Sequence, residues 1–258
     1  MAPRITLLSD FGTVDGYVAA MKGAIAAIAP SAPIDDASHD IPPGDVLAGA
    51  FALRRYWAIY PEGTVHASVV DPGVGSSRKA IVVIADGRIL VAPDNGLLTF
   101  VLRDAKQWAA YCAEQTRFFR DTVSNTFHGR DVFAPLAAHL ANGRKASDVG
   151  PKLEQPLLLQ VAGPNQDGDR VRGEIVCVDH FGNLVTNIPK DLVSPNARIR
   201  LGAHHIVRFG GTYADTASGV PLGLINSDDL LEVAVRDGSA ARTFGIGRGG
   251  KVEVVMEQ

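Results

Sequence analysis

Cysteine is scarce in this sequence. The 258 residues include only Cys112 and Cys177, and the two form no CxxC pair. This excludes a small fold held together by disulfides and argues against a zinc site made of thiolates. A reducing cytoplasm is the compartment that such cysteine usage predicts.

A long apolar run and an excess of one charge are also missing. Charged residues occur at Arg4 and Asp10 and leave no long apolar run between them. We therefore expect neither a signal peptide nor a membrane span at the N-terminus. The formal net charge is −3 and the isoelectric point is about 6.2. Such a balance gives no overall attraction to polyanions, and we expect neither nucleic acid nor a membrane as a partner.

The composition is that of an ordinary globular protein. Hydrophobic residues make up 46 % of the chain and charged residues 21 %, so it can bury a sizeable core. The length of 258 residues predicts one large domain or two unequal ones.

The first 150 residues alternate between strand and helix patterns. Apolar runs at 4–8 and 64–70 each lead into an acidic residue, and a hairpin is predicted at 80–92 around Asp86-Gly87. Alternation of this kind predicts an α/β layered domain with a central sheet over residues 1–150. Helices are expected at 15–29, with Asp15 as N-cap, and at 45–59, 95–102 and 131–141.

The sequence pattern changes after Pro151 from alternating strands and helices to short strands alone. Two prolines in the segment 150–156 mark a linker, because proline continues neither a helix nor a central strand. Beyond it, short apolar stretches at 171–178, 197–209 and 251–256 are separated by glycines. They predict a smaller β-rich, barrel-like domain over residues 157–258.

Three loops at the expected strand ends carry charged or titratable side chains beside glycine. Loops at the carboxyl ends of strands are where open α/β sheets bind ligands. The competing interpretation is structural, since an aspartate at a helix start is usually a cap. The side chains are Asp10 and Asp15, then Asp71 and Arg78, then His128, Arg130 and Asp131.

The chain does not contain the common sequence motifs that bind nucleotide cofactors or metals. The loop 71–78 lacks the Gly-Lys-Ser/Thr ending of a P-loop, and Arg78 stands where a GxGxxG motif needs glycine. The histidines form no HExxH motif and no pair on one helix face. We therefore predict no metal and no cofactor.

A fourth motif lies in the second domain at residues 179–183. Asn183 offers both a donor and an acceptor to a purine edge, and Phe181 can stack on the ring. A simple turn at a strand end would explain the same residues. The polar segment 225–229 also precedes an apolar strand, and turn chemistry explains it equally well.

Taken in order, five motifs resemble one family. They are Ser-Asp-Phe-Gly at 9–12, Asp-Pro-Gly-Val-Gly with Arg78, Pro-Asp-Asn-Gly at 93–96, Thr-Phe-His-Gly-Arg-Asp at 126–131, and Asp-His-Phe-Gly-Asn at 179–183. The sequence resembles the S-adenosylmethionine (SAM) hydrolases, also called SAM hydroxide adenosyltransferases, which are related to the fluorinase and chlorinase. The resemblance spans nearly the whole chain.

The resemblance implies hydrolysis of SAM at ribose C5′, giving adenosine and L-methionine without a cofactor. It also implies a homotrimer whose active sites lie between the first domain of one subunit and the second domain of its neighbour. The catalytic residues it implies are Asp71, Arg78 and His128. The substrate-binding residues are Asp10 at the ribose hydroxyls, Asp15, Asp179 and Ser227 around the methionine, Phe181 and Asn183 at the adenine, and Phe127 and Gly129 near C5′.

Departures from the halogenating relatives favour water as the nucleophile. Those enzymes resemble one another in having Tyr at the position of Asp71 and in lacking His128, and the fluorinase has an extra loop that is absent between residues 96 and 127. Asp228 stands where relatives often have a basic residue or glycine, which is a departure from the family pattern near the methionine carboxylate. The alternatives are a SAM or adenosine sensor without turnover and a SAM-dependent halogenase.

Overall fold

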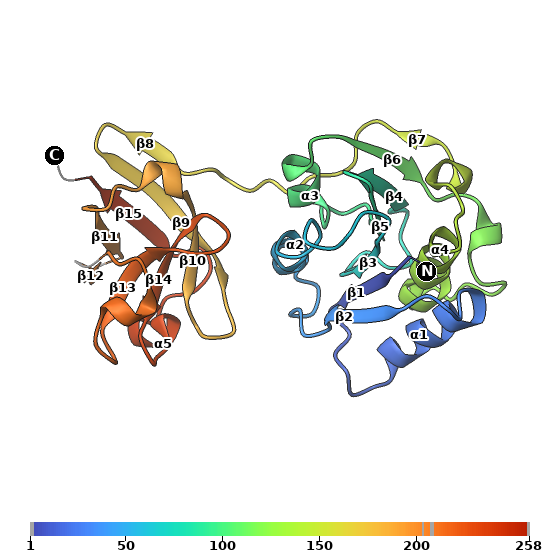
Figure 1. Ribbon diagram of the computed structural model, residues 1–258, viewed down its shortest axis with the longest axis horizontal. Helices are drawn as coiled ribbons and strands as arrows, with labels where there is room; N and C mark the ends of the chain where they lie inside the picture. Colours follow the sequence, from blue (N-terminus) through green and yellow to red (C-terminus); the bar gives the residue numbers. More distant parts are fainter. Residues whose placement is uncertain (1–2, 203, 207–208, 257–258) are drawn as a thin grey trace. The chain divides into compact units, whose positions relative to one another are not determined.

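The chain divides into two compact units, Met1–Leu159 and Gln160–Gln258 (Figure 1). The computed structural model describes residues 3–202, 204–206 and 209–256. No helix in these ranges has the length and apolar character that crossing a membrane requires.

The first unit contains a seven-stranded mixed sheet in the order β2-β1-β3-β5-β4-β6-β7. Strands β2, β1, β3 and β5 run parallel, and β4, β6 and β7 add antiparallel pairs. The predicted α/β domain with a central sheet is thus confirmed. The strands are β1 Ile5–Ser9, β2 Ile34–Ser38, β3 Val65–Val69, β4 Ala80–Ala85, β5 Arg88–Pro93, β6 Trp108–Cys112 and β7 Lys152–Leu153.

Helices cover both faces of this sheet (Figure 1). All five residues of β1 and of β3 are buried, as in a parallel strand covered on two sides. In α1, Val18, Met21 and Ile25 form the buried stripe of an amphipathic helix. The α-helices are α1 Tyr17–Ile28, α2 Val46–Arg54, α3 Thr99–Asp104 and α4 Ala134–Ala141, with 3₁₀ turns at Thr116–Phe118 and Ala146–Val149 and a π-helical turn at Gly129–Phe133.

Several predicted helix ends are wrong for local reasons. Gly16, at a left-handed φ of 78°, takes the N-cap position of α1 in place of Asp15. The helix expected from Asn95 begins at Thr99, because the Asn95 side chain instead bonds Val70 O at 2.9 Å and Leu97 N at 3.2 Å. The helix expected at 45–59 begins as predicted, with Asp45 as a cap that accepts from Ala48 N at 3.0 Å, but it ends at Arg54.

The second unit is an antiparallel sheet that nearly closes into a barrel. Its path is β12-β11-β15-β9-β10-β14-β13, with β8 paired to β9, and a bridge between Phe209 and Gly223 approaches closure. This confirms the barrel-like prediction. The elements are β8 Asn165–Asp167, β9 Arg170–Val178, β10 Leu184–Pro189, β11 Arg198–Leu201, β12 His204–Ile206, β13 Pro221–Ile225, β14 Leu230–Val235, β15 Lys251–Val255, α5 Ala240–Phe244 and the 3₁₀ turns Lys190–Leu192 and Tyr213–Asp215.

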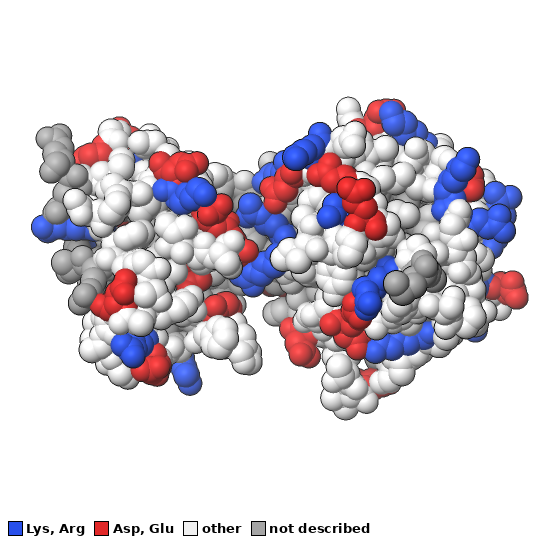
Figure 2. All heavy atoms as spheres, in the orientation of Figure 1, with Lys and Arg blue, Asp and Glu red and all other residues white. Residues whose placement is uncertain are grey.

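Charges of both signs are intermingled on the face of each unit seen in Figure 2. This distribution agrees with the small net charge of −3.

Candidate active site

Two neighbouring strand ends bring the first acidic residues together. Strands β1 and β3 are parallel and pair Ser9 with Val69, so the loops that follow them leave the sheet side by side. Asp10 and Asp71 accordingly border one cavity of about 170 Å³. Its lining is Asp10, Phe11, Gly44, Val69, Asp71, Pro72, Val74, Thr126, Phe127, His128 and Gly129.

At this cavity Arg78 joins Asp71 to His128. Arg78 Nε donates to both carboxylate oxygens of Asp71 at 2.9 Å, and Nη2 makes a further short bond to Oδ2. The same Nη2 lies 2.7 Å from His128 Nδ1. The side chains of Asp71 and Arg78 are only 4 % and 11 % exposed, so their charges are largely shielded from water and interact strongly.

The contact between Arg78 and His128 fixes the tautomer of the histidine. A guanidinium has only donors, so His128 Nδ1 must accept, and the proton of the neutral ring lies on Nε2. Burial and the nearby Arg78 charge lower the pKa of His128 below its usual 6.5, against the opposing influence of Asp71, Asp131 and a Ser124 backbone bond. His128 is therefore neutral at neutral pH.

A buried carboxylate shapes the loop that delivers His128. Asp131 is fully buried and accepts from Arg130 Nε at 2.6 Å, Arg120 Nη1 at 3.1 Å and Ser124 N at 2.9 Å. Burial opposes its ionisation, but these bonds hold the pKa of Asp131 well below its usual range. Asp131 thus joins Arg120, Ser124 and Arg130 by hydrogen bonds and fixes the shape of this loop.

Glycines allow the loops to approach one another closely. A Cβ on Gly75, whose φ is 78°, would lie 2.5 Å from Asn125 O. A Cβ on Gly129 would lie 2.7 Å from the Phe11 ring. Either addition would push the Asp71 and His128 loops apart or displace an aromatic side of the cavity.

The Asp10 carboxylate accepts a hydrogen bond from the backbone and has capacity to accept more. Its Oδ2 accepts from Gly44 N at 2.8 Å. Since an ionised carboxylate can accept about four hydrogen bonds, Asp10 keeps the capacity to bind two neighbouring hydroxyl groups. Phe11 and Phe127 stand edge to face beside it, with ring centroids 5.7 Å apart.

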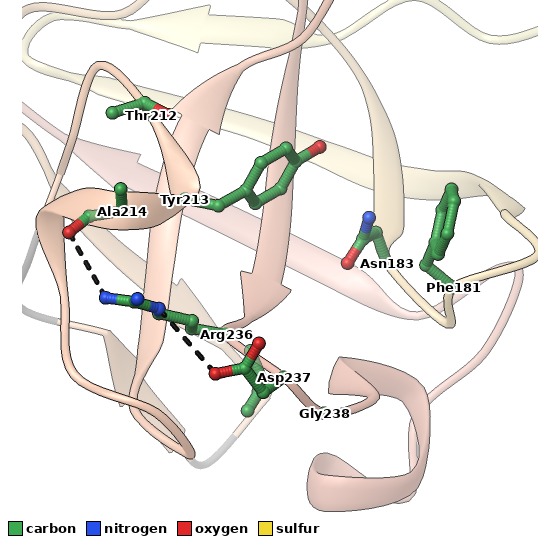
Figure 3. Close-up of a pocket in the computed structure, with 9 residues that line it drawn as sticks. Phe181, Asn183, Thr212, Tyr213, Ala214, Arg236, Asp237 and Gly238 are labelled. Carbon is green, nitrogen blue, oxygen red and sulfur yellow. Dashed lines mark hydrogen bonds and ion pairs between the residues drawn. The ribbon is translucent and has the colours of Figure 1, made fainter.

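A second hollow, of about 630 Å³, lies in the second unit (Figure 3). Phe181 and Asn183 border it, together with the ring of Tyr213 and the segment 235–238. Phe181 is 73 % exposed, so its apolar ring is available for stacking. Across the hollow, Arg236 Nη1 donates to Ala214 O at 3.4 Å, and Nε pairs with Asp237 at 3.7 Å.

Asn183 is oriented by Asp179. Its Nδ2 donates to Asp179 Oδ2 at 3.0 Å, and its backbone N donates to Asp179 Oδ1 at 2.8 Å. The amide oxygen of Asn183 therefore remains as an acceptor for a ligand donor such as an exocyclic amine. In this arrangement Asp179 supports Asn183.

The structure gathers the sequence-predicted residues into two groups. Asp10, Asp71, Phe127, His128 and Gly129 line the first cavity, with Arg78 bonded to two of them. Phe181 and Asn183 line the second, with Asp179 behind Asn183. Asp15 and Ser227 are exposed and are not among the residues lining either cavity.

Sequence reasoning missed Tyr213 and Arg236, which border the second hollow. Tyr213 donates to the buried Glu232 at 2.7 Å, and an acidic residue inside the apolar run 230–235 was the available signal. As for metals, the described ranges contain no cluster of three or more His, Cys, Asp or Glu that could hold an ion.

The His128 tautomer can be tested directly. In nitrogen NMR spectra we expect Nδ1 of His128 to be unprotonated at pH 6.5, with a titration midpoint below 6.5. Arg78→Met should move the midpoint upward, because it removes a nearby positive charge. Lys106→Met, at an exposed position, should leave it unchanged. A protonated Nδ1 in the unaltered protein would contradict the assignment.

Comparison with known proteins agrees with this geometry. The SAM hydroxide adenosyltransferase N-terminal domain matches residues 5–150, and the corresponding C-terminal domain matches residues 173–253. An (R)-S-adenosyl-L-methionine hydrolase of Salinispora tropica is 39 % identical, covering 98 % of this chain and 97 % of that protein. A fluorinase of an Actinoplanes species is 31 % identical, covering 90 % of each.

A solved structure shares the whole architecture. An uncharacterized conserved protein from Thermotoga maritima superposes with a TM-score of 0.92 at 36 % identity, covering 98 % of this chain and all of that one. Both domain matches and full-length relatives above 30 % identity lead to the same conclusion. The chain belongs to the SAM hydroxide adenosyltransferase family.

Proposed function

We propose that this protein hydrolyses S-adenosyl-L-methionine at ribose C5′ to adenosine and L-methionine. The observation that carries the proposal is the bonded set of Asp71, Arg78 and His128 beside the cavity that Asp10 borders. Relatives named (R)-S-adenosyl-L-methionine hydrolase support it across nearly the full chain.

The reaction needs a positioned oxygen nucleophile more than an acid. A bond forms from water oxygen to C5′, the C5′–S bond breaks, and its electron pair returns to sulfur. The sulfonium thereby leaves as a neutral thioether, which requires no protonation. The barrier lies in aligning a desolvated water with the C5′–S bond.

The contacts assign a task to each member of the set. Arg78 has no acceptor, and neutral His128 uses Nδ1 to accept from Arg78. The Asp71 carboxylate accepts three contacts from Arg78, and of its roughly four acceptor positions it keeps about one for the water proton. Arg78 holds Asp71 and His128 in register and polarises the water.

Water rather than halide suits this cavity. The Asp71 carboxylate lines it, and an anion there repels chloride or fluoride. A fluorinase is also a relative, at 31 % identity, and the residues that favour water over halide in this chain are Asp71 and His128.

The binding roles follow the two groups of residues. Asp10 would accept both ribose hydroxyls, while Phe127 and Gly129 would flank C5′. Phe181 would stack on the adenine, with Asn183 accepting from its amine. The methionine part would be contacted by Asp15, Asp179 and Ser227. Of these three, Asp179 is bonded to Asn183, which lines the hollow of the second unit.

We further propose a cytoplasmic homotrimer with active sites at the subunit interfaces. Catalytic and adenine-binding candidates belong to different units of the chain, which is the division expected if each site is completed by a neighbour. Neither Cys112 nor Cys177 is in a disulfide bond, as a reducing compartment favours.

Single substitutions test the catalytic set. Asp71→Asn, Arg78→Lys and His128→Ala should each lower turnover at least about 100-fold, since each removes a charge or a bond that aligns water. Lysine should not rescue Arg78, because it lacks the guanidinium fork. Adenosine affinity, measured by calorimetry, should change far less, and Lys106→Ala should behave as wild type. Unchanged rates in all three variants would refute the assignment.

Complementation tests the interface. Asp71→Asn and Asn183→Ala damage different domains, so a mixed assembly from equal co-expression should contain about one intact site in four if each site joins two subunits. We expect about a quarter of wild-type activity, measured at a SAM concentration low enough that each variant alone is nearly inactive. Activity no higher than the average of the two parents would place each site within a single chain.

A further inference from the structure

A buried serine–histidine pair lies directly behind the loop that carries Asp10. Ser9 Oγ is 2.7 Å from His39 Nδ1, and the two residues are 0 % and 4 % exposed. The backbone of His39 also takes part, because its carbonyl accepts from Gly12 N at 2.8 Å. His39 thus holds both ends of the four-residue loop 9–12.

The pair continues to the surface through two more charged groups. His39 Nε2 lies 3.1 Å from Asp36 Oδ1, and Lys22 Nζ lies 2.6 Å from Asp36 Oδ2. Since a carboxylate only accepts, Nε2 donates to Asp36, and a neutral ring then accepts the Ser9 hydroxyl proton at Nδ1. Ser9 Oγ in turn lies 3.4 Å from Phe11 N.

The sequence of groups is that of a hydrolase triad, but the geometry excludes that role. A serine nucleophile must reach its substrate, whereas Ser9 is completely buried. What the contacts can do is fix the direction in which the next residue, Asp10, leaves the sheet. The segment after His39 adds a third contact, from Gly44 N to Asp10 Oδ2 at 2.8 Å.

We infer that His39 is a positioning residue that aims the Asp10 carboxylate at the vicinal hydroxyls of a ribose. This inference rests on the proposed function, because it takes a nucleoside as the ligand. A hydrogen bond to a charged acceptor is stronger than one between neutral groups, and it weakens steeply as its angle departs from linear. A rotation of loop 9–12 would therefore reduce the contribution of the ribose hydroxyls to binding.

The same strand supplies a matched control. Thr6, three residues before Ser9 on β1, makes an equally buried bond to His66 Nδ1 at 2.8 Å. That pair lies within the paired strands β1 and β3, away from loop 9–12. Thr6→Val consequently removes a buried hydroxyl–histidine bond without releasing Asp10.

The experiment compares the affinities of adenosine and 2′,3′-dideoxyadenosine by calorimetry. In wild type we expect adenosine to bind at least about tenfold more tightly, because only it offers hydroxyls to a carboxylate. In Ser9→Ala and His39→Ala this ratio should fall to about two, and His39→Asn, whose Oδ1 can still accept from Ser9, should restore much of it. Thr6→Val should keep the wild-type ratio, and Ser9→Ala should add nothing once Asp10→Ala is present.

The possible failures are distinct. If wild type binds neither nucleoside and does not act on SAM, the proposed function fails. If wild type discriminates between the nucleosides and Ser9→Ala and His39→Ala discriminate equally well, the positioning role is overturned. A loss of discrimination in Thr6→Val equal to that in Ser9→Ala would also overturn it, since general loosening of β1 would then be the cause.

Discussion

The bond pattern of one guanidinium organises the first cavity. Arg78 is nearly buried and bonds Asp71 on one side and His128 on the other. Because its charge must be compensated once water is excluded, the loops carrying Asp71 and His128 are drawn to the same place. The tautomer of His128 follows from this arrangement, and its pKa is lowered first by burial and then by the Arg78 charge.

The sheet supplies the frame in which this interaction can form. Parallel pairing of β1 with β3 sets Asp10 beside Asp71, and buried polar pairs such as Ser9 with His39 fix the loops that leave these strands. Polar groups inside an α/β core are costly unless they are satisfied. Here, satisfying them also orients the side chains of the cavity.

Much of this could be predicted from sequence because strand ends and glycine loops leave local signals. The hairpin around Asp86-Gly87 and the helix starting near residue 45 were readable in this way. The same signals marked the loops of Asp71, Arg78 and His128, but only the family resemblance joined these three residues into one set. Contacts between distant segments left no such signal. The role of His39 depends on Ser9, which lies 30 residues away in the chain. The Asp15 cap is wrong for a local reason, because Gly16 takes the N-cap position of α1.

The most direct test of the account is the reaction itself. Purified protein would be incubated with SAM at matched low and high chloride, and adenosine, 5′-chloro-5′-deoxyadenosine and methionine would be quantified by chromatography. We predict equal amounts of adenosine and methionine, independent of chloride. A chlorinated nucleoside, or bound SAM that is never consumed, would contradict the assignment of a hydrolase.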